Sequence, residues 1–96
     1  MSTTIVRDVQ TTVAEYLREL AGALGHMDYE VRGNRVIAHT DQGTVVIKLT
    51  YEGDRHLGSL DLPMTKVEIT CIGFTDEQAK AFLSHYDSKM FRAGVV

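Results

Sequence analysis

The first part of the chain has apolar residues at steps of three and four positions. Between residues 5 and 24 these are Val6, Val9, Val13, Leu17, Leu20 and Leu24, with Tyr16 beside them. This spacing places them on one stripe of an α-helix. Gly25 follows, and glycine ends helices readily because it adopts the left-handed cap conformation. The pattern predicts an amphipathic helix over residues 5–24, with its N-cap at Ser2, Thr3, Thr4 or Asp8.

From residue 27 onward the period of the pattern changes to two, which is typical of half-buried strands. Gly33 and Asn34 suit a two-residue hairpin turn because both residue types tolerate positive φ. Such a turn pairs Val31 with Val36 and leaves Ile37 on the outer face, whereas a slip of one residue would turn Ile37 inward. The core face of this hairpin is then formed by Tyr29, Val31, Val36 and Ala38.

Two further strand regions follow. A strand over residues 44–51, after a four-residue turn at 40–43, places Ile37 opposite Val46 and Arg35 opposite Lys48 on the outer face. Residues 52–56 are polar and form a loop or an extended hairpin tip. The alternation resumes over 57–62 and 67–72. It changes phase near Pro63, which predicts a bulge or bend at a sheet edge because proline cannot donate to a ladder.

The last element is a second amphipathic helix. Thr75 and Gln78 have the spacing of a capping box, in which each side chain bonds the backbone N–H of the other residue. Apolar residues then recur at helical spacing at Ala79, Phe82, Leu83, Tyr86 and Met90. The sequence therefore predicts one α+β domain over residues 1–96: a helix, an antiparallel four-stranded β-meander and a helix. Both helices cover one face of the sheet in a two-layer arrangement.

Composition narrows the class of protein. The chain has 96 residues, 44% of them hydrophobic, and a formal net charge of −3, so it has no general attraction to nucleic acid or to an anionic membrane. The single cysteine, Cys71, excludes an intramolecular disulfide, which favours a reducing compartment. The N-terminus does not have the pattern of a signal peptide, and no apolar run approaches the ~20 residues that span a bilayer. We expect a cytoplasmic protein of bacterial type.

No residue pattern indicates catalysis or a cofactor. The four histidines lack metal-ligand spacing, and the one pair that the predicted register supports is His39 opposite Asp28. Cys71 is in phase with core positions, where a free cysteine behaves as a small hydrophobe. No serine lies in a nucleophile elbow. We therefore expect neither a metal site nor a cofactor, and an enzyme is the less favoured class.

The outer face of the predicted sheet is the most informative surface. Ile37 and Val46 are neighbours on a face that should be polar, and Ile72 lies on the same face. We interpret these residues as a partner-binding surface, although β-branched residues also favour strands for their own sake. Three basic residues lie on this face as well, namely Arg32, Arg35 and Lys48. Nucleic acid is not the favoured partner, because the face also carries glutamates and has no aromatic residue for base stacking.

The predicted order of helix, meander and helix resembles the frataxin family in architecture. The run from Tyr29 to Val36 is similar to the first hairpin of that family. Frataxins have an acidic first helix that gathers iron, whereas the corresponding segment here carries only Asp8, Glu15 and Glu19, alongside two arginines. The tryptophan pattern of the family is absent because the chain has no tryptophan. The sequence is therefore not assigned to that family.

Three hypotheses about function follow from these observations. The leading one is a non-enzymatic protein–protein interaction or assembly module, a homodimer formed through the outer sheet face or an edge strand. The second is a small-ligand-binding or minor enzymatic domain that uses the 52–58 loop, with Arg55 and His56 as its polar groups. The third is a small phage- or plasmid-encoded inhibitor protein, which the size and mild acidity permit.

Overall fold

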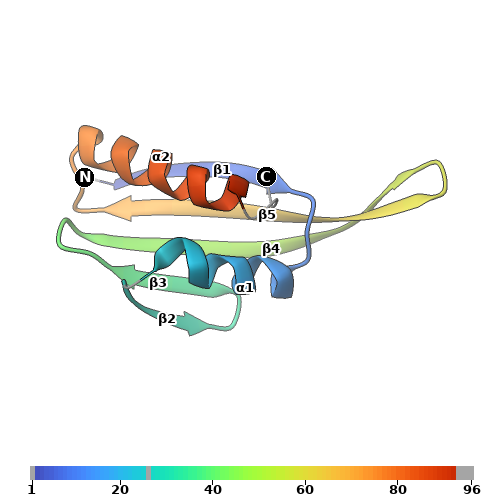
Figure 1. The fold of residues 1–96 in the computed structure, drawn as a ribbon, viewed down its shortest axis with the longest axis horizontal. Coiled ribbons are helices and arrows are strands. Elements are labelled where there is room, and N and C mark those ends of the chain that lie inside the picture. Colours follow the sequence, from blue (N-terminus) through green and yellow to red (C-terminus); the bar gives the residue numbers. More distant parts are fainter. Residues whose placement is uncertain (1, 26, 93–96) are drawn as a thin grey trace.

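Five antiparallel strands form one sheet, and two helices lie side by side over one of its faces (Figure 1). The computed structural model describes residues 2–25 and 27–92. The elements are β1 (Ser2–Val9), α1 (Val13–Leu24), β2 (Asp28–Arg32), β3 (Arg35–His39), β4 (Thr44–Leu57), β5 (Leu60–Ile72) and α2 (Asp76–Arg92). The strand order is β1-β5-β4-β3-β2, so a meander of four strands is extended by β1 beside its last strand. The predicted α+β class is confirmed, with one strand more than expected.

The N-terminal segment is a strand and not part of the first helix. It pairs with β5 along its whole length, with Ile5 opposite Ile69. The prediction of helix was therefore wrong for residues 5–12. Ile5 and Val9 pack into the core, whereas Val6 between them is 55% exposed. The abundance of threonine, valine and isoleucine favours a strand here, and the helical spacing of Val6 and Val9 was coincidental. The resemblance to frataxins rested on the order helix, meander, helix. Because β1 precedes the first helix, the observed order of elements no longer matches it.

Helix α1 begins later than predicted, at a capping signal of its own. The hydroxyl of Thr12 accepts a hydrogen bond from the backbone N–H of Glu15 at 3.1 Å. Glu15 also accepts a hydrogen bond from the Thr11 hydroxyl at 2.9 Å. A threonine followed three residues later by a glutamate is the spacing of a capping box. At the other end, Gly25 has φ of 60° and bonds Ala21, as a C-terminal glycine is expected to do.

The registers predicted for the meander are confirmed. Val31 lies opposite Val36 across the two-residue turn, and Ile37 lies opposite Val46. Val36 and Ala38 are fully buried, as expected for the core face. The prediction that Val31 belongs to the core face was wrong, because its side chain is 51% exposed. It has the right phase, but β2 is the outermost strand and the helices pack over the inner strands.

One continuous core lies between the helices and the sheet. Helix α2 begins with the predicted capping box, since Thr75 and Gln78 each bond the backbone N–H of the other residue. The largest fully buried side chains in the core are Tyr16, Tyr86, Leu20, Leu24, Ile47, Leu49 and Ile69. Cys71 is buried among them, as predicted. The Tyr16 and Tyr86 hydroxyls are hydrogen-bonded to each other, which joins the two helices inside the core.

Strands β4 and β5 continue beyond the body of the sheet as a two-stranded arm. β1 ends opposite Thr65, so residues 53–64 pair only within this hairpin. We call these residues the arm; it makes the molecule 46 Å long but only 23 and 22 Å across (Figure 1). The extended form of the predicted tip is confirmed. The irregularity expected at Pro63 lies on the opposite strand, between Tyr51 and Gly53, where Glu52 forms a bulge.

Candidate interaction face of the sheet

The face of the sheet opposite the helices carries its side chains in rows that the strand registers define. We call this surface the outer sheet face. One row, from β1 to β2, consists of Thr4, Thr70, Val46, Ile37 and Glu30. The next row consists of Val6, Glu68, Lys48, Arg35 and Arg32. Neither helix covers these rows, because the side chains that the helices bury pack against the other face.

Apolar side chains gather on this face. Ile37 and Val46 are cross-strand neighbours, as predicted, and each is half-buried by the side chains around it. Ile72 is 46% exposed and pairs with Thr44, so it lies one row away from Val46 and diagonal to it. Val6 adds a fourth apolar side chain at the β1 end. The sequence pattern does not place Val6 on this face, because it predicts a helix for the segment that contains Val6.

The three basic residues predicted for this face lie together in one row. Arg32 is opposite Arg35, and Arg35 is opposite Lys48. Glutamates accompany them: the Arg32 Nε lies 3.3 Å from a carboxylate oxygen of Glu30, and Lys48 is opposite Glu68. Both side chains of the Arg32–Glu30 pair are largely exposed, so the pair contributes little to stability. The row is therefore of mixed charge and does not form the uninterrupted basic stripe that binds a phosphate backbone.

Arg55 and His56, the predicted ligand-binding residues, lie in the arm and not in a loop above a cavity. They are successive residues of β4, so their side chains point to opposite faces of the arm. The His56 Nδ1 contacts a carboxylate oxygen of Asp61 across the hairpin. Arg55 lines a shallow groove of about 350 Å³ at the junction between arm and body. The structure does not bring the two side chains together.

Negative charge is concentrated at the same junction. The bulge residue Glu52 and Asp8 of β1 line the groove beside Arg55. A hydrogen bond between the two carboxyl groups raises the pKa of Glu52 above its usual value, because the bond requires one of them to keep its proton. Lys66, which pairs with Asp8 in the register, partly offsets this effect. A cationic side chain brought to this junction would therefore find an acidic pair.

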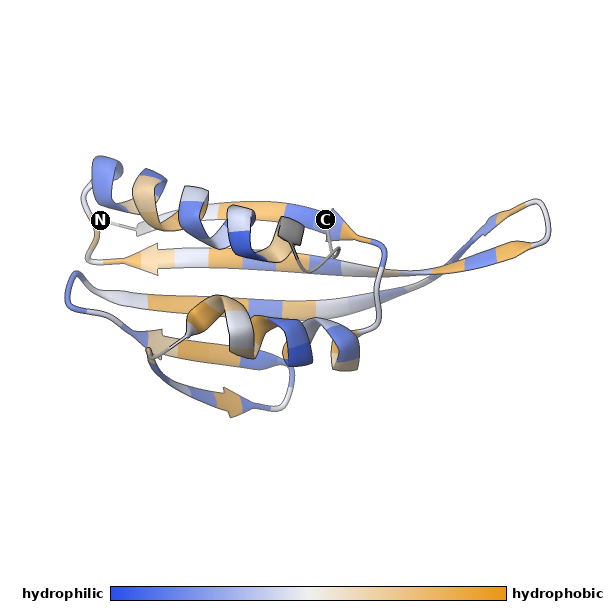
Figure 2. Cartoon of the chain, viewed as in Figure 1, coloured by the Kyte–Doolittle hydropathy of each residue, from blue (hydrophilic) through white to orange (hydrophobic). Residues whose placement is uncertain are grey.

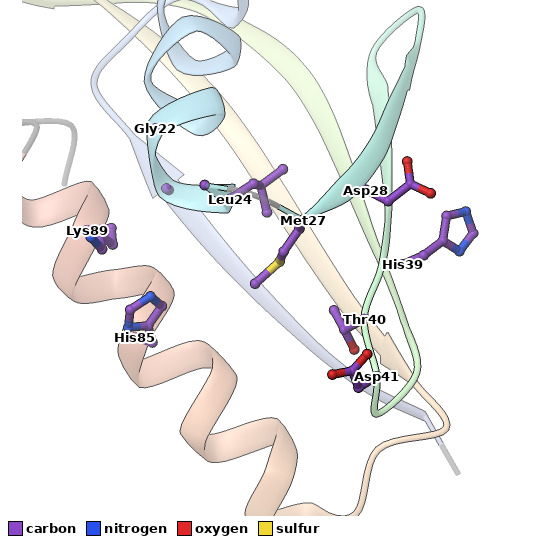
Figure 3. Close-up of a pocket in the computed structure, with 11 residues that line it drawn as sticks. Gly22, Leu24, Met27, Asp28, His39, Thr40, Asp41, His85 and Lys89 are labelled. Carbon is purple, nitrogen blue, oxygen red and sulfur yellow. The ribbon is translucent and has the colours of Figure 1, made fainter.

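A larger groove of about 630 Å³ lies where the end of α1 meets the β3–β4 turn and α2 (Figure 3). Leu24 and Met27 lie within it, and His85 of α2 stands across from them. Asp28 and His39 are cross-strand partners, as predicted, but their side chains point away from α2. Within the described parts of the chain, no three histidine, cysteine or carboxylate side chains gather in a way that could hold a metal ion. The polar groups around this groove do not converge on a shared position.

Gly22 of α1 lines this groove. Its replacement by alanine would measure the effect of helix propensity on stability at a position where the added atom meets no obstacle. A Cβ atom added there would meet no other atom within 4 Å. Glycine in a helix interior costs roughly 0.5–1 kcal/mol relative to alanine. We expect Gly22→Ala to raise the free energy of unfolding by about that amount in urea denaturation. A loss of stability would show that the groove requires a bare backbone.

Comparisons with known proteins add no family or relative. No protein-family model matches the sequence, and a search of curated proteins finds no match to it. Neither of the two helices, over the residues described, is long and apolar enough to cross a bilayer.

Proposed function

We propose that this chain is a non-enzymatic protein–protein interaction and assembly module that binds a second copy of itself through the outer sheet face. The observation that carries the proposal is the Ile37–Val46 pair on a face that neither helix covers. Ile72 extends the apolar area toward β5, whereas Val6 on β1 lies apart from it beyond Thr70 and Glu68; both Val6 and Ile72 are exposed in the single chain. Contiguous apolar area of this kind on a sheet face is typical of an interaction surface.

The physical properties of this face favour association. Complete burial of an exposed valine or isoleucine side chain contributes roughly 1.5–3 kcal/mol. Ile37 and Val46 are already half-buried in the single chain and would contribute less than this, and Ile72 is 46% exposed. The surrounding row has basic residues on β2, β3 and β4 and an acidic residue, Glu68, on β5. An interface between identical chains requires a self-complementary surface, and a row with both signs of charge is compatible with that requirement.

The double variant Ile37→Glu/Val46→Glu tests this proposal. Burying four carboxylates across the interface of a dimer is strongly unfavourable, so we expect a monomer where the parent chain is a dimer. Molar mass should be measured by size-exclusion chromatography with light scattering over a hundredfold range of concentration.

Val31→Glu is the matched control, because Val31 is an exposed valine on the other face of the sheet. Val31→Glu should have the same molar mass in solution as the parent chain. The circular dichroism spectra of all variants should match that of the parent chain. A double variant with the same mass as the parent chain at every concentration would contradict the use of the outer sheet face.

A further inference from the structure

Strand β2 is the last strand at one margin of the sheet. Its residues on the helix side are Tyr29 and Val31, which have the phase of core positions. Val31 is nevertheless 51% exposed, because the sheet continues from β2 on one side only. Figure 2 shows a hydrophobic position among hydrophilic ones along this strand, and no other element of the described chain lies beyond it. A further strand beside β2 would cover this side chain.

The hydrogen bonds of the neighbouring strands determine which backbone groups of β2 are engaged. The Leu49 N–H donates to the Asn34 carbonyl at 2.8 Å, and the Thr40 N–H donates to the Gly43 carbonyl at 2.9 Å. Both bonds fit the register of β3 with β4, in which bonded and non-bonded pairs alternate. Residues 34, 36, 38 and 40 therefore bond toward β4, and residues 35, 37 and 39 bond toward β2.

This alternation leaves a row of backbone groups at the margin of β2. The β2 residues opposite positions 35, 37 and 39 are Arg32, Glu30 and Asp28, so their backbone groups are used within the sheet. Tyr29 and Val31 alternate with them, and their N–H and C=O groups point outward. We call this margin the β2 edge. Such an edge adds an extended peptide as a further strand through main-chain hydrogen bonds.

The side chains of the β2 edge determine which strand fits beside it. On the helix side, Tyr29 and Val31 favour apolar neighbours. On the other side, Asp28 and Glu30 are exposed and line a hollow of about 190 Å³. Glu30 also contacts Arg32, but both side chains are largely exposed and the pair is weak. The pair that Glu30 forms with an added antiparallel strand is the non-hydrogen-bonded kind, in which side chains lie closest, so a basic residue fits there.

From these features we infer that the β2 edge binds an extended segment of another protein in which apolar and basic residues alternate. The apolar side chains of that segment pack beside Tyr29 and Val31, and its basic side chains lie opposite Glu30 and Asp28. The net charge of −3 also favours a basic partner. This inference goes beyond the proposed self-association and does not rest on it, because the edge and the outer sheet face are different surfaces.

A second copy of the chain fits the β2 edge less well. Antiparallel pairing of two β2 strands over all five residues sets Glu30 of one chain against Glu30 of the other. Like charges directly opposite each other are destabilising. A shift of two residues sets Asp28 against Glu30, and the opposite shift leaves three residues of each strand paired before the turn at Gly33.

The other margin of the sheet is less suited to strand addition. There β1 directs Arg7 to the helix side, where its guanidinium lies 2.6 Å from a carboxylate oxygen of Asp87. A charged residue that points inward from an edge strand disfavours the addition of a further strand. The β1 margin therefore provides a control for binding at the β2 edge.

Titration with synthetic peptides, followed by NMR of the isotope-labelled chain, tests the inference. One capped peptide alternates valine with lysine, and a second alternates valine with glutamate. We expect the lysine peptide to shift the amide signals of Tyr29 and Val31, because their N–H groups become hydrogen-bonded. The glutamate peptide should bind at least about tenfold more weakly, since its acidic groups face Asp28 and Glu30.

Two variants locate the binding site. Val31→Pro removes an outward N–H at an edge position where proline is tolerated, so the dissociation constant for the lysine peptide should rise about tenfold or more. Val6→Pro is the matched control, because the same alternation across β4 and β5 leaves the Val6 N–H facing outward from β1. It should bind the lysine peptide like the parent chain. Glu30→Lys alters only a side chain and should reverse the preference between the two peptides.

The inference is overturned if millimolar lysine peptide leaves the Tyr29 and Val31 amides unchanged, or if both peptides bind equally. Equal losses in Val31→Pro and Val6→Pro would also overturn it. Shifts of the two amides on concentrating the chain without peptide would assign the edge to a second copy and overturn the proposed partner. A parent chain that stays monomeric but binds the lysine peptide at the β2 edge would contradict only the proposed function.

Discussion

Replacing Gly43 with alanine is expected to lower the free energy of unfolding by about 3 kcal/mol and the melting temperature by roughly 12–20 °C. Gly43 closes the turn between β3 and β4, where its carbonyl accepts a hydrogen bond from the Thr40 N–H at 2.9 Å. A Cβ atom there would lie 2.2 Å from the backbone oxygen of Ile72 and 2.9 Å from a ring carbon of Phe74. Because a backbone atom is the obstacle, a change of rotamer cannot relieve the clash.

The measurement is urea denaturation of Gly43→Ala beside Gly22→Ala. The two variants carry the same chemical change, but the added atom meets open space at Gly22 and backbone at Gly43. Their effects on stability should therefore have opposite signs. A chain of this size has a total stability of only about 5–14 kcal/mol, so the loss at Gly43 would be a large fraction of it. Equal effects at the two positions would show that the turn moves to accept the alanine.

The second large effect is expected at the buried pair Tyr16 and Tyr86. Each side chain is only 2% exposed, and each hydroxyl has the other as its partner. Tyr86→Phe leaves the Tyr16 hydroxyl buried without that partner, which should cost about 1–3 kcal/mol, and Tyr16→Phe should cost a similar amount. The double variant removes both polar groups and should be close to the parent chain in stability. The double-mutant cycle measured by urea denaturation would then show a strong coupling, and simple additivity of the two losses would contradict this account.

The same pair should make stability depend on alkaline pH. Burial raises the pKa of Tyr16 from 10.0 to about 12 and raises the pKa of Tyr86 further. The folded chain thus holds these protons more tightly than the unfolded chain. Stability is fully present below pH 10 and falls as the pH rises from there through the raised values, by up to about 1.4 kcal/mol per pH unit for each tyrosine. The double phenylalanine variant should lose much less stability between pH 9 and pH 11.

The sequence predicted the meander well because local signals agree there. Alternation, a Gly33-Asn34 turn and a four-residue turn at 40–43 all define one register, and a slip would have exposed the core face. The prediction failed at the N-terminus because Val6 and Val9 have the spacing of a helical stripe, whereas in the observed strand they lie on opposite faces. The partner of this strand is β5, and the paired residues are 56 (Val9 and Thr65) to 70 (Ser2 and Ile72) positions apart in the chain, so no local pattern could reveal the pairing. The capping box at Thr12 and Glu15 was the one local signal that would have placed the helix start correctly.

The candidate interaction face was partly visible in the sequence. Ile37 opposite Val46 and the basic row followed from the register alone, which the structure confirms. The sequence left the arm as one of two alternatives, a loop or an extended hairpin tip. A polar segment with a glycine resembles a loop, and the continuation of pairing past a bulge depends on both strands together. Leu57 and Leu60 are exposed because the hairpin projects beyond the body of the sheet, and the composition of the segment does not predict this projection.

The position of β1 has a consequence for the order of folding events. The hairpins β2–β3, β3–β4 and β4–β5 join residues that are close in sequence, so each can form rapidly after its strands are synthesised. Ser2 pairs with Ile72, and closing a loop of that length carries a large entropic cost before any contact rewards it. During synthesis the first strand must therefore wait for nearly the whole chain, and a four-stranded sheet with an exposed β5 edge is the expected intermediate. Chains in that intermediate could exchange their first strands, so rapid refolding at high concentration should favour strand-swapped species.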